Sequence, residues 1–390
     1  MVWKITKSFL GFFFTILISC ESYNDDNLKL LNSDMSDMVV NINVRNTASP
    51  LEFSEISDSL YYIPIKIPNQ FPEIAEIYKI KVFDGKIGIF DAFHSALHII
   101  NYSGELINVF YVDGSEGHGT FQDVEDFEFL GDTLLLYERS TQVIHKYDIF
   151  SKEYFGYLPV DLLFIEFNLF EDKFYIYGDE DRFGLSDPRA NKLQIYNKGM
   201  DRLTYSSIPY VPGRDEFDTP QRFYEHQDRI YFSELYDDTI YSFRNDKILA
   251  EFVIYFGSYD IPAKLLNTND QDLIGFEFFE NKYRGFKHFL IATDEWLSFW
   301  YREGIDQKFC FYDKSNDKTF NVSSFIDTKN SGTLPFPMTY DFENKLFLSV
   351  IPKEYINYQN KTSNGQSNLS NVYSEGVLNY LLCYKIKDKL

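Results

Sequence analysis

The chain has 390 residues and a formal net charge of −22, with 37 basic residues facing 59 acidic ones. Phosphate binding needs clustered Lys and Arg, so this balance argues against a nucleic-acid partner and against docking onto anionic lipid. The 30 Tyr and 39 Phe favour half-buried strands, because aromatic side chains pack well on a pleated surface. The composition therefore predicts an all-β protein.

The first twenty residues have the pattern of an export signal. Lys4 and Lys7 precede an apolar run from Phe9 to Ile18, which is shorter than the ~20 residues needed to span a bilayer. A small residue and then Cys20 end the run, as in a bacterial lipobox. We expect residues 1–19 to be a lipoprotein signal peptide and Cys20 to carry the lipid. A plain signal peptide or an uncleaved anchor is the alternative.

The segment 20–53 is polar, rich in Asn and Asp, and without periodicity. Such a composition predicts a disordered tether between the lipid and the folded domain. The domain is then expected to occupy residues 54–390. This organisation predicts an outer-membrane lipoprotein, and it leaves open whether the domain lies on the periplasmic or the cell-surface side.

One pattern recurs six times within the expected domain. Each copy has a strand, a tight polar turn such as Asp84-Gly85, a second strand, and a third strand that ends on an aromatic, as in Ile99-Ile100-Asn101-Tyr102. Four-stranded units repeated at roughly 40–50 residues are typical of propeller blades. We therefore predict a six-bladed β-propeller. A pair of β-sandwich domains is the alternative, although no linker interrupts the series.

The last copy indicates how the ring closes. It stops at its third strand, Leu381 to Ile386, and so lacks a fourth. The β-rich segment Leu60–Ile65 lies just before the first blade and can supply the missing strand. Such closure would remove an exposed sheet edge that could otherwise template aggregation.

Two cysteines remain after the signal segment. Cys310 and Cys383 both lie in apolar third strands, where a thiol is usually a small buried hydrophobe. A disulfide between neighbouring blades is the alternative in an oxidising compartment. A metal site built on these two residues is not expected, because zinc sites need about four clustered ligands.

In a four-stranded blade, the first and third connections lie on one side of the disc, and the second connection and the link to the next blade lie on the other. All the long connections of this chain are second connections or links between blades, so we expect them on the same face. Loops on a rigid scaffold carry variable function, so this face and the central funnel beneath it are the expected ligand-binding region. An Arg beside aromatic rings can hold a carboxylate or stack on a sugar, whereas an ordinary surface ion pair is the alternative. The candidate ligand-binding residues are His118, Arg214, Arg222, Tyr283 and Arg284.

One acidic loop resembles the start of a calcium site. Asp179–Gly184 has carboxylates at positions one and three and Gly at six, but position twelve is Ala190 where an EF-hand needs Glu. Looser calcium binding and a solvated acidic loop are the two remaining interpretations. We expect no other metal or cofactor. No Ser/His/Asp order, HExxH motif or nucleotide fingerprint is present, so no catalytic residue is assigned.

The chain resembles the Bacteroidetes six-bladed β-propeller lipoproteins. The resemblance rests on Leu17–Cys20, on Ser59–Ile65, and on Gly114–Phe121 leading into Val124–Phe127. It covers about Ser54 to Leu390. The family usually has a Gly-Pro-Gly-Glu-like loop where this chain has Gly-His-Gly-Thr. The resemblance implies the propeller fold and an exported location, and it implies no particular chemistry.

These observations predict a non-enzymatic binding or scaffold protein at the cell envelope. A glycan, a peptide or a partner protein is the expected ligand of the long-loop face. The alternative is a metal-dependent hydrolase or lactonase with carboxylates in the central funnel, since propellers host both classes.

Overall fold

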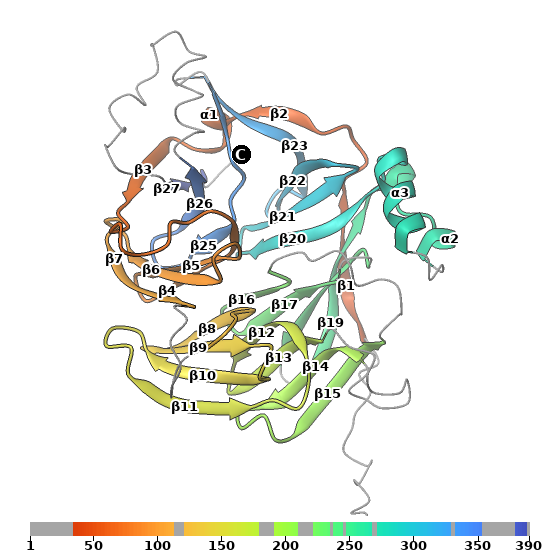
Figure 1. The fold of residues 1–390 in the computed structure, drawn as a ribbon. Coiled ribbons are helices and arrows are strands. Elements are labelled where there is room, and N and C mark those ends of the chain that lie inside the picture. The colour runs from red at the N-terminus through yellow and green to blue at the C-terminus, as the bar shows by residue number, and fades with distance from the viewer. Residues whose placement is uncertain are drawn as a thin grey trace, which may run out of the picture.

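A computed structural model describes residues 34–112, 121–178, 191–209, 221–234, 237–244, 247–266, 271–328, 332–352 and 379–387. Six four-stranded antiparallel blades surround a common centre (Figure 1). The first strand of each blade lies innermost and contacts the first strands of its neighbours (Figure 1). The six-bladed β-propeller expected from the repeats is thus confirmed. No helix in the described ranges is long and apolar enough to cross a membrane.

The strands of the first three blades follow chain order from the centre outward. Blade 1 contains β4 (Ile77–Phe83), β5 (Lys86–Asp91), β6 (Ala96–Asn101) and β7 (Leu106–Tyr111); blade 2 contains β8 (Asp126–Leu130), β9 (Thr133–Glu138), β10 (Val143–Asp148) and β11 (Tyr154–Pro159); blade 3 contains β12 (Phe164–Phe170), β13 (Lys173–Gly178), β14 (Asn191–Asn197) and β15 (Leu203–Pro209).

Blades 4 to 6 repeat this order with additions. Blade 4 contains β16 (Phe223–His226), β17 (Arg229–Ser233), β18 (Thr239–Arg244) and β19 (Lys247–Tyr255); blade 5 contains β20 (Arg284–Ala292), β21 (Trp296–Glu303), β22 (Asp306–Asp313) and β23 (Lys318–Asp327), with β24 (Gly332–Leu334) beside β23; blade 6 contains β25 (Thr339–Asp341), β26 (Leu346–Pro352) and β27 (Asn379–Lys385). Two helices, α2 (Ala263–Leu266) and α3 (Gln271–Asn281), lie between blades 4 and 5 in the chain.

The ring closes through a strand from the other end of the chain. β3 (Ser59–Ile65) pairs antiparallel with β27, from Ile65 opposite Asn379 to Ser59 opposite Lys385. It is the outermost strand of blade 6. This confirms the prediction that the segment around Leu60–Ile65 completes the last blade.

Strands also occur where we expected part of the tether. β1 (Asp34–Asn43) pairs parallel with β19, and β2 (Ser49–Glu52) pairs parallel with β23, just before helix α1 (Phe53–Ile56). Backbone pairing with an outer strand does not need a strongly apolar sequence, which is why a polar segment can join the sheet. Ile42 in β1 and Val44 just after it are both fully buried and alternate with polar residues. This alternation is the pattern that indicates β1.

Close packing between blades depends on a small residue at one position. A Cβ atom on Gly88 of β5 would lie 2.8 Å from the ring of Phe127, so a larger residue there would displace that ring. Phe127 and Phe129 therefore pack against blade 1 through one face of β8. Because strand side chains alternate, the residues between them point to the other face.

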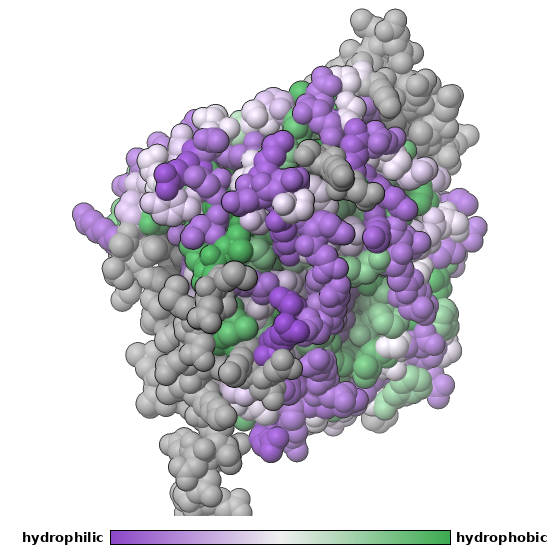
Figure 2. All heavy atoms as spheres, turned by 180° about the vertical axis from the view of Figure 1, so that it is seen from behind, coloured by the Kyte–Doolittle hydropathy of each residue, from purple (hydrophilic) through white to green (hydrophobic). Residues whose placement is uncertain are grey.

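The cysteines are both free and buried. Burial raises the pKa of the Cys383 thiol to about 12 and raises that of Cys310 further. The disulfide alternative is therefore not found, and both thiols act as small buried hydrophobes. On the outside, the back face of the molecule is largely hydrophilic with smaller hydrophobic areas between (Figure 2).

Candidate functional site: a central polar network and its pocket

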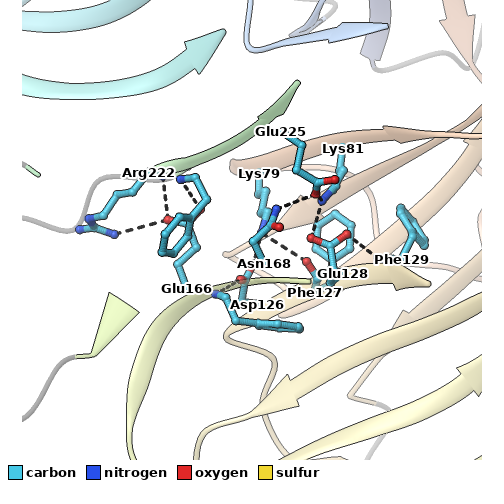
Figure 3. A network of polar contacts seen from close by, with 12 residues as sticks. Lys79, Lys81, Asp126, Phe127, Glu128, Phe129, Glu166, Asn168, Arg222 and Glu225 are labelled. Carbon is cyan, nitrogen blue, oxygen red and sulfur yellow. Dashed lines mark hydrogen bonds and ion pairs between the residues drawn. The ribbon is translucent and has the colours of Figure 1, made fainter. Parts of the chain in front are cut away.

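Four neighbouring innermost strands carry polar side chains at alternate positions. Such alternation inside otherwise apolar strands directs one face of each strand to the blade interface and the other to the centre of the ring. The residues that meet at the centre are Lys79 and Lys81 on β4, Asp126 and Glu128 on β8, Glu166 and Asn168 on β12, and Glu225 on β16 (Figure 3).

Asp126 joins three blades. Its Oδ1 atom accepts a hydrogen bond from Lys79 Nζ at 2.7 Å, and its Oδ2 atom accepts one from the backbone N–H of Phe167 at 2.8 Å. Lys79 also donates to the carbonyl oxygen of Phe127 at 3.3 Å. Both charged side chains are buried, so each depends on the other for compensation of its lost hydration.

Lys81 is the centre of a second group of contacts. Its ammonium group binds the carboxylates of Glu128 and of Glu225, the latter at 2.8 Å (Figure 3). Asn168 Nδ2 donates to the same Glu225 oxygen at 2.8 Å. This arrangement links blades 1 to 4 around the centre, with Glu128 buried and Glu225 partly exposed.

Arg222 forms the edge of the network just before β16. The carboxylate of Glu166 accepts backbone hydrogen bonds from Arg222 at 2.8 Å and from Phe223 at 3.2 Å. The guanidinium lies 3.8 Å from the same carboxylate and 4.2 Å from the ring centre of Tyr177. Arg222 is only 1% exposed, so it holds this end of β16 in place.

Burial changes the acidity of these groups. It raises the pKa of Asp126 to about 6 despite the opposing ammonium of Lys79, and it also raises the pKa of Glu128. Burial opposes the charge of Lys81 as well, but the carboxylates of Glu128 and Glu225 outweigh it and raise the Lys81 pKa. The lysine therefore stays charged, and the acids protonate more readily than exposed ones.

A pH-dependent stability follows from Asp126. Its folded pKa of about 6 exceeds the ~3.9 of an unfolded Asp, so between these values the folded state binds more protons. Raising the pH from about 4 to about 6 should therefore lower the unfolding free energy of wild type relative to Asp126→Asn, measured by urea denaturation.

The matched control is Asp148→Asn. The pKa of Asp148 is lowered by hydrogen bonds from Ser151, so wild type should gain stability relative to this variant as the pH rises through the acid range. A difference between wild type and Asp126→Asn that does not change with pH would contradict the raised pKa.

A cavity of about 190 Å³ lies over this network. Phe83, Phe129, Tyr340 and Phe342 come from the ends of first strands or the turns that follow them, so the cavity lies at the end of the ring that carries the first turns. The ring of Phe342 is 41% exposed at this end and stacks on His226, with 4.9 Å between the ring centres. Lys81, Glu128, Asn168 and Glu225 form its polar part.

Three residues that line the cavity each have a buried polar atom without a protein partner in the part of the chain that the structure describes. These atoms are Asn168 Oδ1, Gln221 Oε1 and the Tyr224 hydroxyl. Buried polar atoms are almost always hydrogen-bonded, and an unpaired one costs about 1–3 kcal/mol. Gln221 also has a φ of 60°, in the left-handed region that a non-glycine residue seldom adopts. These features make the cavity the candidate binding site of the described residues.

The structure describes three of the five residues that were expected to bind a ligand. His118 and Arg214 lie outside the described residues, as do Cys20 and the acidic loop Asp179–Gly184. Arg222 belongs to the edge of the central network. Tyr283 packs beside helix α3, with Phe278 and Phe286.

Arg284 has a structural environment at the start of β20. It pairs with Glu303 at 2.7 Å, donates to the carbonyl oxygens of Val44 and Asn46, and lies over the ring of Tyr259 at 3.9 Å. It is 1% exposed and ties the N-terminal segment to blade 5. Arg222 and Arg284 therefore both lie inside the protein, and neither guanidinium is presented on the surface.

The residues of the central network, apart from Arg222, were not among the ligand-binding residues predicted from the sequence, because that prediction favoured the long loops. A usable pattern exists in the first strands: Lys79 and Lys81, and likewise Asp126 and Glu128, alternate with apolar residues. A charged residue at every second position of a buried strand indicates a polar face within the fold.

No group of three or more His, Cys, Asp or Glu side chains suited to hold a metal ion occurs among the described residues. The carboxylates of the network are instead paired with lysines or backbone N–H groups. The chemistry that the described site supports is recognition through hydrogen bonds, charge and aromatic rings.

Comparison with known proteins places this architecture. A candidate exported protein from Bacteroides fragilis is 15% identical, with a TM-score of 0.71 that covers 90% of this chain and 100% of that one. A member of the DUF4221 family from Bacteroides vulgatus is 10% identical, with a TM-score of 0.48, covering 85% and 97%. No curated protein matches the chain. The family model for the domain of unknown function DUF4934 matches residues 38–375, and the chain therefore belongs to the DUF4934 family.

Proposed function

We propose that this protein is an exported, lipid-anchored propeller that binds a small ligand in its central pocket. The observation that carries the proposal is the set of unpartnered buried atoms of Asn168, Gln221 and Tyr224 around one cavity. A ligand that bonds to these atoms would offset the cost of burying them. The rigid ring holds them in place before binding, which reduces the ordering cost of association.

Export is supported by the pattern of residues 1–20 and by the similar fold of the candidate exported protein from Bacteroides fragilis, whereas lipid attachment is supported by the sequence that ends at Cys20 alone. Cys20 is the proposed lipid attachment site, and the outer membrane is the proposed location. The long-loop face, with His118 and Arg214, stays a predicted surface for a glycan, peptide or protein partner.

The pocket is tested with a metabolite library and a thermal shift readout. Wild type should be stabilised by at least one compound, and Asn168→Leu should lose that stabilisation because it removes an acceptor and fills its place with apolar atoms. Asn108→Leu is the matched control, since Asn108 donates to the carbonyls of Ile149 and Phe150 on blade 2, away from the pocket. The same shift in wild type and Asn168→Leu would refute the pocket as the binding site.

A further inference from the structure

The hydrogen-bonding capacity of the pocket is unbalanced. The Nζ atoms of Lys79 and Lys81 each already bind two protein oxygens, and Asn168 Nδ2 donates to Glu225. That last bond also fixes the orientation of the Asn168 amide, so its unpartnered atom is the acceptor oxygen. The unpartnered Gln221 Oε1 is a second acceptor. The pocket therefore offers two unpartnered acceptor oxygens, together with the Tyr224 hydroxyl, which can donate or accept.

The charge balance favours the same kind of ligand. Three cationic side chains, Lys79, Lys81 and Arg222, face four carboxylates, and the network therefore has a formal net charge of −1; the carboxylates are Asp126, Glu128, Glu166 and Glu225. Glu225 is the most exposed of these carboxylates, with 34% of its side chain accessible. An anionic ligand would meet this carboxylate at close range and be repelled, whereas a cation would be attracted.

Aromatic rings surround the same space. Phe83 stacks with Phe129 on one side, and Phe342 lies edge-on to Tyr340 on the other, with 5.1 Å between their ring centres. The faces of such rings attract cations as well as apolar groups. Aromatic side chains next to the carboxylate of Glu225 are thus suited to a cation that also has an apolar group.

We propose, on the basis of the pocket function above, that the ligand is an organic cation whose ammonium group binds Glu225, Asn168 and Gln221. An ammonium group has three donors and no acceptor, which matches the available acceptors. A single hydroxyl has only one donor and would leave one of these acceptors unpaired. The apolar part of the ligand lies among Phe83, Tyr340 and Phe342.

The probes for this inference share one shape and differ in charge. Phenethylamine, which is protonated at pH 7, is compared with neutral 2-phenylethanol and anionic phenylacetate by titration calorimetry, with glucose as a sugar probe. We expect phenethylammonium to bind at least about tenfold more tightly than 2-phenylethanol, because charged hydrogen bonds are stronger than neutral ones.

Two substitutions assign the binding to the pocket. Glu225→Gln should weaken phenethylammonium binding about tenfold or more, whereas Glu343→Gln, an exposed site next to Phe342, should leave it within about twofold. Phe342→Ala should also weaken it, and this variant leaves the Lys81 ion pairs in place. Urea unfolding of each variant establishes that it is folded.

The outcomes separate this inference from the pocket function. Equal affinity for phenethylammonium and 2-phenylethanol, or glucose binding that Asn168→Leu abolishes, would overturn the cation while the pocket stands. Failure of every probe, together with a library screen without an Asn168-dependent shift, would overturn both proposals.

Discussion

A chain that begins at Lys66 should fail to form a cooperative folded state. It lacks β1, β2, α1 and β3, and with them the core side chains Ile42, Phe53, Ile56 and Ile65, each at most 5% exposed. Their burial contributes about 6–12 kcal/mol at roughly 1.5–3 kcal/mol each, which is comparable with the ~5–15 kcal/mol that stabilises a typical domain. The loss of β3 also exposes the edge of β27.

Circular dichroism and urea unfolding measure this effect. A chain that begins at Asp34 retains every one of these strands and is the control, and it should unfold at the same urea concentration as the full chain. A cooperative transition at that concentration in the Lys66 chain would show that the N-terminal strands are dispensable.

A milder version of this test changes one side chain of the closing strand. Ile65→Ala should lower the unfolding free energy by about 2–5 kcal/mol, because Ile65 is buried in the core at the end of β3. Tyr61→Ala on the same strand is the matched control and should cost far less, since Tyr61 is 55% exposed.

The second large effect is expected from Lys81→Met. This change removes the ammonium that compensates the buried carboxylate of Glu128, and an unpaired buried charge costs about 3–5 kcal/mol. The loss should be larger at pH 8 than at pH 5. The pKa of Glu128 is raised in the folded protein, so the Glu128 carboxylate takes up a proton at a higher pH in the folded state than in the unfolded state. This protonation removes the unpaired charge as the pH falls.

Two further variants identify the cause. Lys81→Met combined with Glu128→Gln should recover most of the stability, because no unpaired charge remains on Glu128. Lys86→Met is the matched control, since Lys86 pairs with the exposed Asp84 and Asp132 and such pairs contribute about 0–1 kcal/mol. Equal losses for Lys81→Met and Lys86→Met in urea unfolding would refute a special role for the central pair.

The blades and the closing strand could be predicted because their evidence is local. Alternating apolar residues and tight turns such as Asp84-Gly85 specify strands and hairpins within a few residues, and repetition supplies the ring. The same reasoning could have found the end of β1, where Val40 and Ile42 alternate with polar residues. Its partner strand could not be predicted, because β1 pairs with β19 through backbone groups, which every residue has, and no side-chain pattern specifies that partner.

The candidate site was decided by the tertiary structure. Sequence alternation shows that Lys79, Lys81, Asp126 and Glu128 share one face of their strands, but Lys81 and Glu225 are 144 residues apart. They meet only because ring closure brings the first strands of four blades to a common centre. The sequence by itself therefore determined the repeating blade and its closure, which depend on local periodicity. Charge pairing, burial and the unpartnered acceptors of the pocket depend on distances between blades, which only the folded ring sets.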